Sequence, residues 1–137
     1  MATTTVLSNP YLSIDSNDFT DQCTSAVVTS MKEALEDTAF GSTARTYTAG
    51  LQSNEIVVTL LLSYGASEVE AILDGLVGTK FNTVVGADGS ATPAASNPVY
   101  TLTNGYLESF TPINGSVGTL QTVDITIRGG ALTRATS

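Results

Sequence analysis

The sequence predicts a mainly β protein, an antiparallel β-sandwich or half-closed barrel with one short flanking α-helix. Within residues 55–64, apolar side chains recur at every second position, as in a strand that packs one face on a core. Just beyond this stretch, a helix over about residues 67–77 is predicted by apolar residues spaced i, i+3, i+4 and i+7, namely Val69, Ile72, Leu73 and Leu76. Most of the remaining chain is rich in Thr, Ser and Val and is broken by turn residues, which favours further strands.

Both ends of the predicted helix carry local signals. Ser67 and Glu70 have the spacing of a capping box, in which a hydroxyl and a carboxylate satisfy backbone N–H groups of the first turn. Gly75 and Gly78 provide stops. On the preceding strand, Val57 and Leu61 point away from the core face, so we expect that second face to be covered by this chain or by another copy of it.

The N-terminal third is predicted to contain two strands after a flexible arm, residues 1–10. A short strand over residues 11–14 is followed by a turn at residues 15–18. Residues 22–35 alternate over a long stretch and predict one long strand, with a helix over residues 31–35 as the alternative.

Residues 36–52 show no clear period and are interpreted as a long loop. Structureless loops of this length are uncommon and are usually functional or ordered by a partner. Four of its side chains, together with the two outward residues of the preceding paragraphs, are the predicted subunit-interface residues: Phe40, Arg45, Tyr47, Leu51, Val57 and Leu61.

The C-terminal half is expected to be β again. A short strand over residues 81–85 precedes a Gly/Ala/Ser/Pro-rich loop over residues 86–98. Residues 99–110 contain Asn104-Gly105, which indicates either a hairpin or one long strand with a bulge. Residues 119–128 alternate as a strand, and residues 129–137 are interpreted as a polar tail.

Composition narrows the possible functions of what we expect to be a single domain, residues 1–137. Only 13% of residues are charged, about half the usual share, and the net charge is −8. Five Lys and Arg residues do not form a basic patch, so the sequence disfavours a nucleic-acid partner held through its phosphates. No segment has the length of a membrane span or the pattern of a secretory signal, and one cysteine fits synthesis in a reducing cytoplasm.

The sequence offers little for catalysis or for a cofactor. Without histidine there is no Ser-His-Asp arrangement and no set of zinc ligands. Asp15, Asp18 and Asp21 are spaced like calcium ligands but lack the EF-hand order, and turn carboxylates explain them. Cys23 is interpreted as a small buried hydrophobe. We therefore expect neither an enzyme nor a metal or cofactor site.

Four stretches, in order along nearly the whole chain, resemble the small major tail proteins (tail tube proteins) of long-tailed bacteriophages, especially those of actinobacteria. Residues 14–21 resemble the family's "I-D-G-x-D-L-S-D", and residues 36–51 its "D-x-T-x-F-G…A-G-L". Residues 66–73 are the third stretch. The fourth begins at residues 96–100 and continues through residues 111–118 into the last strand and residues 132–136. Asn104-Gly105 departs from the family, which usually runs straight through at this point.

The resemblance implies a structural virion protein made in the cytoplasm of a host bacterium. It implies six subunits per ring, with rings stacked into a hollow tube around a tape-measure protein and bounded by tail terminator and tail-tip proteins. DNA would pass through the lumen without being held, and Glu108 and Asp124 are the predicted lumen-facing carboxylates. A capsid decoration or head–tail joining protein is the alternative. A carbohydrate-binding β-domain is disfavoured because the chain has no tryptophan.

Overall fold

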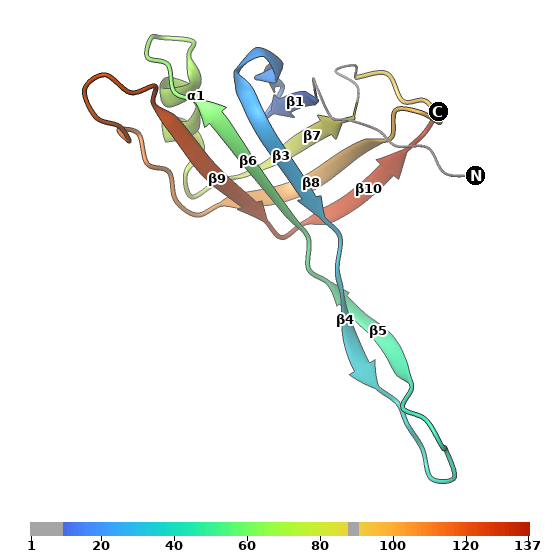
Figure 1. Ribbon diagram of the computed structural model, residues 1–137. Coiled ribbons are helices and arrows are strands. Elements are labelled where there is room, and N and C mark those ends of the chain that lie inside the picture. The colour runs from blue at the N-terminus through green and yellow to red at the C-terminus, as the bar shows by residue number, and fades with distance from the viewer. Residues whose placement is uncertain (1–9, 88–90) are drawn as a thin grey trace.

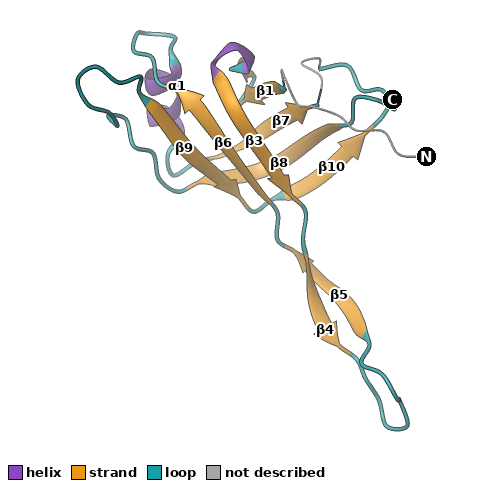
Figure 2. Ribbon diagram, in the orientation of Figure 1, coloured by secondary structure: helices purple, strands orange, loops and turns teal. Residues whose placement is uncertain are grey.

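The computed structural model describes residues 10–87 and 91–137, which form a β-sandwich with a long projecting hairpin (Figure 1; Figure 2). A short 3-10 turn spans Thr20–Gln22. The remaining elements are β1 (Tyr11–Ile14), β2 (Asn17–Asp18), β3 (Cys23–Thr29), β4 (Lys32–Glu36), β5 (Tyr47–Gln52), β6 (Glu55–Leu61), α1 (Val69–Leu76), β7 (Lys80–Gly86), β8 (Val99–Leu107), β9 (Thr122–Arg128) and β10 (Ala131–Ala135).

The strands of the body form one antiparallel sheet in the order β2-β1-β7-β8-β9-β6-β3. It folds over so that β9, β6 and β3 face β1, β7 and β8 across the core (Figure 1). β8 joins the two layers, because one of its edges pairs with β10 at residues 99–103 and then with β9 at residues 106–107. The predicted mainly β fold with one short helix is confirmed.

The core lies between the inward faces of these strands. On β6 and β9 the buried residues alternate with more exposed ones, as strand geometry requires. The helix α1 closes one end of the sandwich with Val69 and Leu73, and Phe19 from the β2 side packs into the same cluster. The largest fully buried side chains are Leu12, Ile14, Ile56, Val58, Leu60, Val69, Leu73, Leu102, Leu107, Val123, Ile125 and Ile127.

The start of α1 differs from the prediction. The helix begins at Val69 after an extended Glu68, and Ser67 forms no capping bond. Instead, the Val69 N–H donates to the Ser63 hydroxyl at 3.4 Å, and that hydroxyl donates to the Glu68 carboxylate at 2.8 Å. The capping-box prediction was therefore wrong, because Ser63, which follows the end of β6, supplies the hydroxyl that Ser67 was expected to supply.

Asn104 and Gly105 lie within one bulged strand, so the hairpin alternative was wrong. Phe81 pairs with Gly105 and Thr83 with Leu102, which leaves one more residue on β8 than on β7. Asn104 has a positive φ of 60°, which asparagine tolerates better than most residues. Its N–H donates to the Asn82 side chain at 3.2 Å.

Two predictions for the segment from residue 22 to residue 52 were wrong. The long strand is interrupted at residues 30–31 and becomes β3 and β4, and no helix forms at residues 31–35. The predicted loop contains β5, which pairs with β4 as a two-stranded sheet separate from the body. This hairpin lacks a core-facing period because it has no core to face.

The expectations for the chain ends had different outcomes. Residues 131–135 of the predicted polar tail form β10, which pairs along β8 from Ala131↔Thr103 to Ala135↔Val99. The predicted arm, residues 1–10, lies outside the described residues except for Pro10. The loop over residues 86–98 also lies partly outside them; its later part closes with reciprocal backbone hydrogen bonds between Ala94 and Asn97.

Candidate assembly surfaces

The β4–β5 hairpin projects away from the sandwich (Figure 1), and nearly all of its strand residues are exposed. The pairing Ala34↔Ala49 and Glu36↔Tyr47, with strand alternation, puts Tyr47, Ala49 and Leu51 on one face, with Ala34 and Glu36 beside them. The Leu51 side chain is 82% exposed and the Tyr47 side chain 56%. Exposed apolar side chains gathered on one face indicate a contact surface for another molecule.

Polar bonds hold the outer part of the hairpin without a core. The Asp37 carboxylate accepts hydrogen bonds from the hydroxyls of Thr46, at 2.5 Å, and Thr48. These bonds, that of Thr46 first, lower the pKa of Asp37. The Thr46 N–H also donates to the Thr38 hydroxyl at 2.9 Å. The hairpin is therefore a built element that positions its exposed side chains.

Phe40 and Arg45 lie in the segment that joins β4 to β5, at the end of the hairpin farthest from the sandwich (Figure 1). The Phe40 ring is fully exposed in the bend between the strands. Arg45 pairs loosely with Glu36, with 3.9 Å between Nη1 and Oε1 and both side chains exposed. An exposed pair of this kind contributes little to stability, so Arg45 is free to serve a partner.

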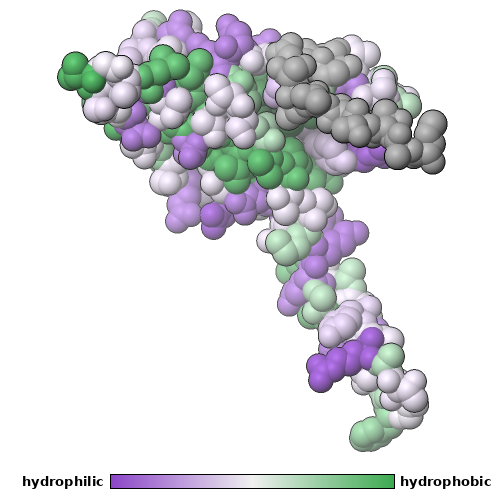
Figure 3. Space-filling view, in the orientation of Figure 1, coloured by the Kyte–Doolittle hydropathy of each residue, from purple (hydrophilic) through white to green (hydrophobic). Residues whose placement is uncertain are grey.

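The other predicted interface residues lie on the outer face of the β9-β6-β3 layer. Val57 and Leu61 are half-buried on β6, and Val57 pairs with Val27 of β3, whose side chain is 52% exposed. In the space-filling view a green, apolar area covers the region of β3 and β6 (Figure 3). The structure thus brings Val57 beside an apolar neighbour that sequence reasoning did not select.

The two predicted lumen carboxylates occupy different positions. Asp124 is exposed on the same outer face of β9 and accepts a 2.6 Å hydrogen bond from the hydroxyl of Thr59 on β6. Glu108 is exposed directly after the end of β8. Asp124 and the Val27–Val57 pair therefore lie on one surface. The cross-strand pair Thr59–Asp124 makes it acidic, and the neighbouring pair Val27–Val57 makes it apolar.

The free edge of β3 is a further surface. β3 ends the strand order of the body sheet, and its outer edge has no strand partner within residues 10–87 and 91–137. An apolar hollow of about 150 Å³ lies beside it, lined by residues that include Ala26, Val28, Val85 and Tyr100. Unpaired strand edges are templates for pairing with another chain.

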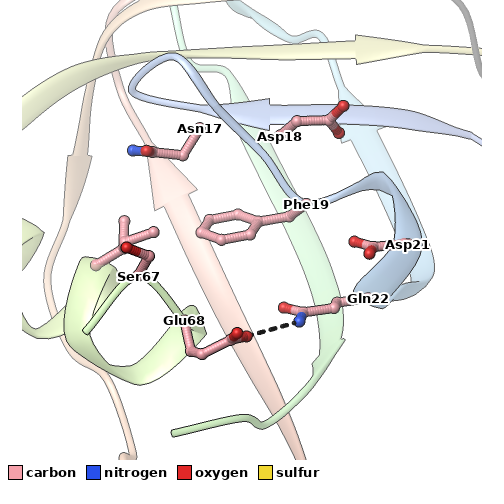
Figure 4. Close-up of a pocket in the computed structure, with 8 residues that line it drawn as sticks. Asn17, Asp18, Phe19, Asp21, Gln22, Ser67 and Glu68 are labelled. Atoms are coloured by element: carbon pink, nitrogen blue, oxygen red, sulfur yellow. Dashed lines mark hydrogen bonds between the residues drawn. The ribbon is translucent and has the colours of Figure 1, made fainter. Parts of the chain in front are cut away.

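A polar pocket of about 270 Å³ lies beside the start of α1 (Figure 4). The Gln22 side-chain amide donates to Glu68 Oε2 and to the Ser63 hydroxyl, both at 3.2 Å. The hydroxyl of Ser63 and then the amide of Gln22 lower the pKa of Glu68. These bonds tie the 3-10 turn to α1, which gives the pocket a structural role that the sequence did not reveal.

Nothing in the described part of the chain forms a group of metal-ligating side chains. Asp18, one of the three aspartates weighed as calcium ligands, instead accepts a 2.9 Å bond from the Thr20 N–H. Bonds to Thr20 lower the pKa of Asp18.

Burial raises the pKa of the half-buried Cys23 thiol. Over the residues that the structure describes, no helix is both long and apolar enough to cross a lipid bilayer.

Comparisons with known proteins identify the fold. No protein-family model and no curated protein sequence matches the chain. Solved structures do match. The anti-feeding prophage cap, a tube terminating cap, has a TM-score of 0.70 and 12% identity, covering 100% of this chain and 95% of its own. A chain of the sheath–tube complex of the extracellular contractile injection system PVC has a TM-score of 0.68 and 11% identity, covering 94% and 89%.

A third similar structure is the tail of an empty gene transfer agent particle, determined with C6 symmetry. Its TM-score is 0.56 at 13% identity, with 91% of this chain and 92% of that chain covered. At these identities the likeness is one of fold. The chain has, over nearly its whole length, the fold found in tube and tube-cap proteins of phage-like tails and injection systems.

Proposed function

We propose that this chain is the self-assembling subunit of a hollow phage tail tube, as in small major tail proteins of actinobacteriophages. Six copies form a ring, and rings stack into a tube around a tape-measure protein, between a tail terminator and tail-tip proteins. The mature location is the virion tail, after synthesis in the host cytoplasm. The role is structural, with no catalysis and no cofactor.

The observation that carries this proposal is the projecting β4–β5 hairpin, which exposes Tyr47 and Leu51 on one face in a fold similar to those of assembled tubes. An isolated two-stranded hairpin is marginally stable in water, so a projecting one gains from a neighbouring subunit. In the proposed tube Phe40, Arg45, Tyr47 and Leu51 contact a neighbouring copy. Val57 and Leu61 contribute to the same assembly through the outer face of β6.

The charge balance suits a conduit for DNA. A net charge of −8 repels phosphates, so the wall does not hold the passing DNA. Asp124 and Glu108 are both exposed, and we propose that they face the lumen. Asp124 pairs with Thr59, which lies between Val57 and Leu61 on the same outer face, so the proposed lumen wall and subunit contact meet on this face.

A concentration series followed by light scattering and negative-stain electron microscopy tests the proposal. Hollow tubes of uniform diameter, or stacked rings, are the expected result. A capsid decoration or head–tail joining protein is the competing function. Trimers, or single rings that never stack at any concentration, would favour that function over a tube subunit.

A further inference from the structure

The loop that joins β8 to β9 presents apolar side chains to solvent. Val117 is fully exposed, and Ile113 and Leu120 are each 77% exposed. We name residues 111–121 the apolar loop. An ordinary surface loop exposes polar side chains, so three exposed aliphatic residues within eight positions indicate a docking surface.

The polar side chains of this loop hold its backbone in place. The Asn114 amide donates to the Thr122 carbonyl at 2.8 Å, and Thr119 Oγ1 donates to the Ser116 carbonyl at 2.7 Å. The Tyr64 hydroxyl is a donor shared by the Pro112 carbonyl, at 2.9 Å, and the Gln121 side chain, at 2.8 Å. These bonds fix the backbone of the loop, whose residues 111–120 are all exposed, so ordering it on binding costs little.

The occupant is indicated by chemistry and by position. Residues 109–123 carry no charge, in a chain whose net charge is −8, and residues 46–54 of the hairpin carry none either; the one carboxylate paired across from this part of β5 is Glu36, opposite Tyr47. The apolar loop lies at the end of the molecule that also holds α1, and the hairpin leaves from the opposite end (Figure 1). Two complementary surfaces at opposite ends cannot meet within one copy, but they meet in a head-to-tail stack of copies.

We propose that the apolar loop of one copy binds the Tyr47–Leu51 face of the hairpin of a second copy. The inference rests on the proposed function and adds the receptor surface for the hairpin. The contact is heterologous, because different patches meet, and its repetition gives an open-ended stack. Tyr47 and Leu51 then lose their exposure against Ile113, Val117 and Leu120.

Photo-crosslinking within the assembled protein tests the contact. Benzoylphenylalanine replaces Tyr47, and the assembly is irradiated and digested with a protease that cleaves after Glu and Asp. Cleavage after Glu108 and Asp124 releases residues 109–124, which we expect as the main crosslinked peptide. The same probe at Leu35, the exposed partner of Thr48 on the other hairpin face, is the matched control and should label that peptide at least fivefold less.

The outcomes separate the two proposals. Tubes whose Tyr47 probe labels another segment, or labels residues 109–124 no more than the Leu35 probe does, would overturn the contact and leave the tube function standing. If the wild-type chain remains monomeric under every assembly condition, including addition of the tail-tip proteins, both the tube function and the contact are overturned.

A mixing experiment tests the directionality of the contact. Tyr47→Asp removes the hairpin face and Val117→Asp the loop face, and both sites are exposed, so the variants should fold. We expect neither variant to stack alone, whereas rings of the two variants, formed separately and then mixed, form stacks that end at two layers. The control mixture of Val117→Asp and Leu120→Asp rings should not stack. Equal stacking in both mixtures would overturn the proposal.

Discussion

A β-carbon on Gly130 would lie 2.1 Å from the carbonyl oxygen of Thr103, so β10 can begin beside β8 only with glycine at this position. Gly130 also has a positive φ of 76°. The contact lies where the chain leaves β9 and begins to pair along β8 as β10. We predict that Gly130→Ala lowers the free energy of unfolding by at least about 2 kcal/mol, measured by urea denaturation.

The matched control for this prediction is Gly129→Ala. Gly129 has a similar φ of 82°, but the space around its missing β-carbon is open. Its substitution should therefore cost only the backbone term, about 1 kcal/mol. Equal losses of unfolding free energy in the two variants would show that the close approach to Thr103 does not constrain the connection between β9 and β10.

The hydrogen bonds to Glu68 predict a pH dependence of stability. They lower the pKa of this carboxyl in the folded state relative to the unfolded state. Their contribution is therefore present above the unfolded pKa and is lost as the pH falls through the folded pKa. We expect Glu68→Gln to be less stable than wild type at pH 7, and the gap in urea midpoint to close at low pH. A gap independent of pH would contradict this account.

Phe40→Ala and Arg45→Ala separate folding from assembly. Both side chains are exposed on the hairpin, so each variant should keep its free energy of unfolding within about 0.5 kcal/mol of wild type. We expect folded subunits that fail to form tubes, by circular dichroism and electron microscopy. Asp74→Asn, at an exposed position of α1, is the control and should assemble normally. Normal tubes from both hairpin variants would refute the role assigned to the hairpin end.

Reversal of charge at Asp124 tests the lumen assignment. Asp124→Lys replaces an exposed carboxylate with an ammonium group, and on the tube wall that group would attract phosphates. We expect particles with this variant to assemble and to eject DNA several-fold more slowly, with the defect reduced at high salt. Asp124→Asn should have a smaller effect. Unchanged ejection by Asp124→Lys would place this residue away from the lumen.

Sequence periodicity predicted the elements that contact the core. β6 and β9 alternate cleanly because one face of each strand is buried, and α1 shows a stripe because it covers one end of the sandwich. The register of the bulge at Asn104 was not decided, because Asn-Gly is equally compatible with a turn. The choice depends on strands elsewhere in the sequence: β7 pairs along both halves of β8, β10 pairs with its first half and β9 with its second half.

Sequence periodicity did not reveal the strands that lie away from the hydrophobic core. β5 has exposed residues on both faces, so its sequence has no period that distinguishes a strand from a loop. β10 is stabilised by pairing along β8, which its short, mostly polar sequence does not reveal. Aromatic and apolar residues in an apparent loop indicate an interface at Phe40, Arg45, Tyr47 and Leu51, and the structure places all four on the hairpin. The sequence does not indicate Val117 and its apolar neighbours as interface residues, because it does not reveal that their side chains are exposed.

The most direct measurement of the central claim is the rotational symmetry of the assembled protein seen end-on by cryo-electron microscopy. The account predicts hollow rings with six-fold symmetry, stacked into tubes when viewed from the side. Three-fold particles, solid filaments, or rings that never stack in the presence of tail-tip proteins would contradict it.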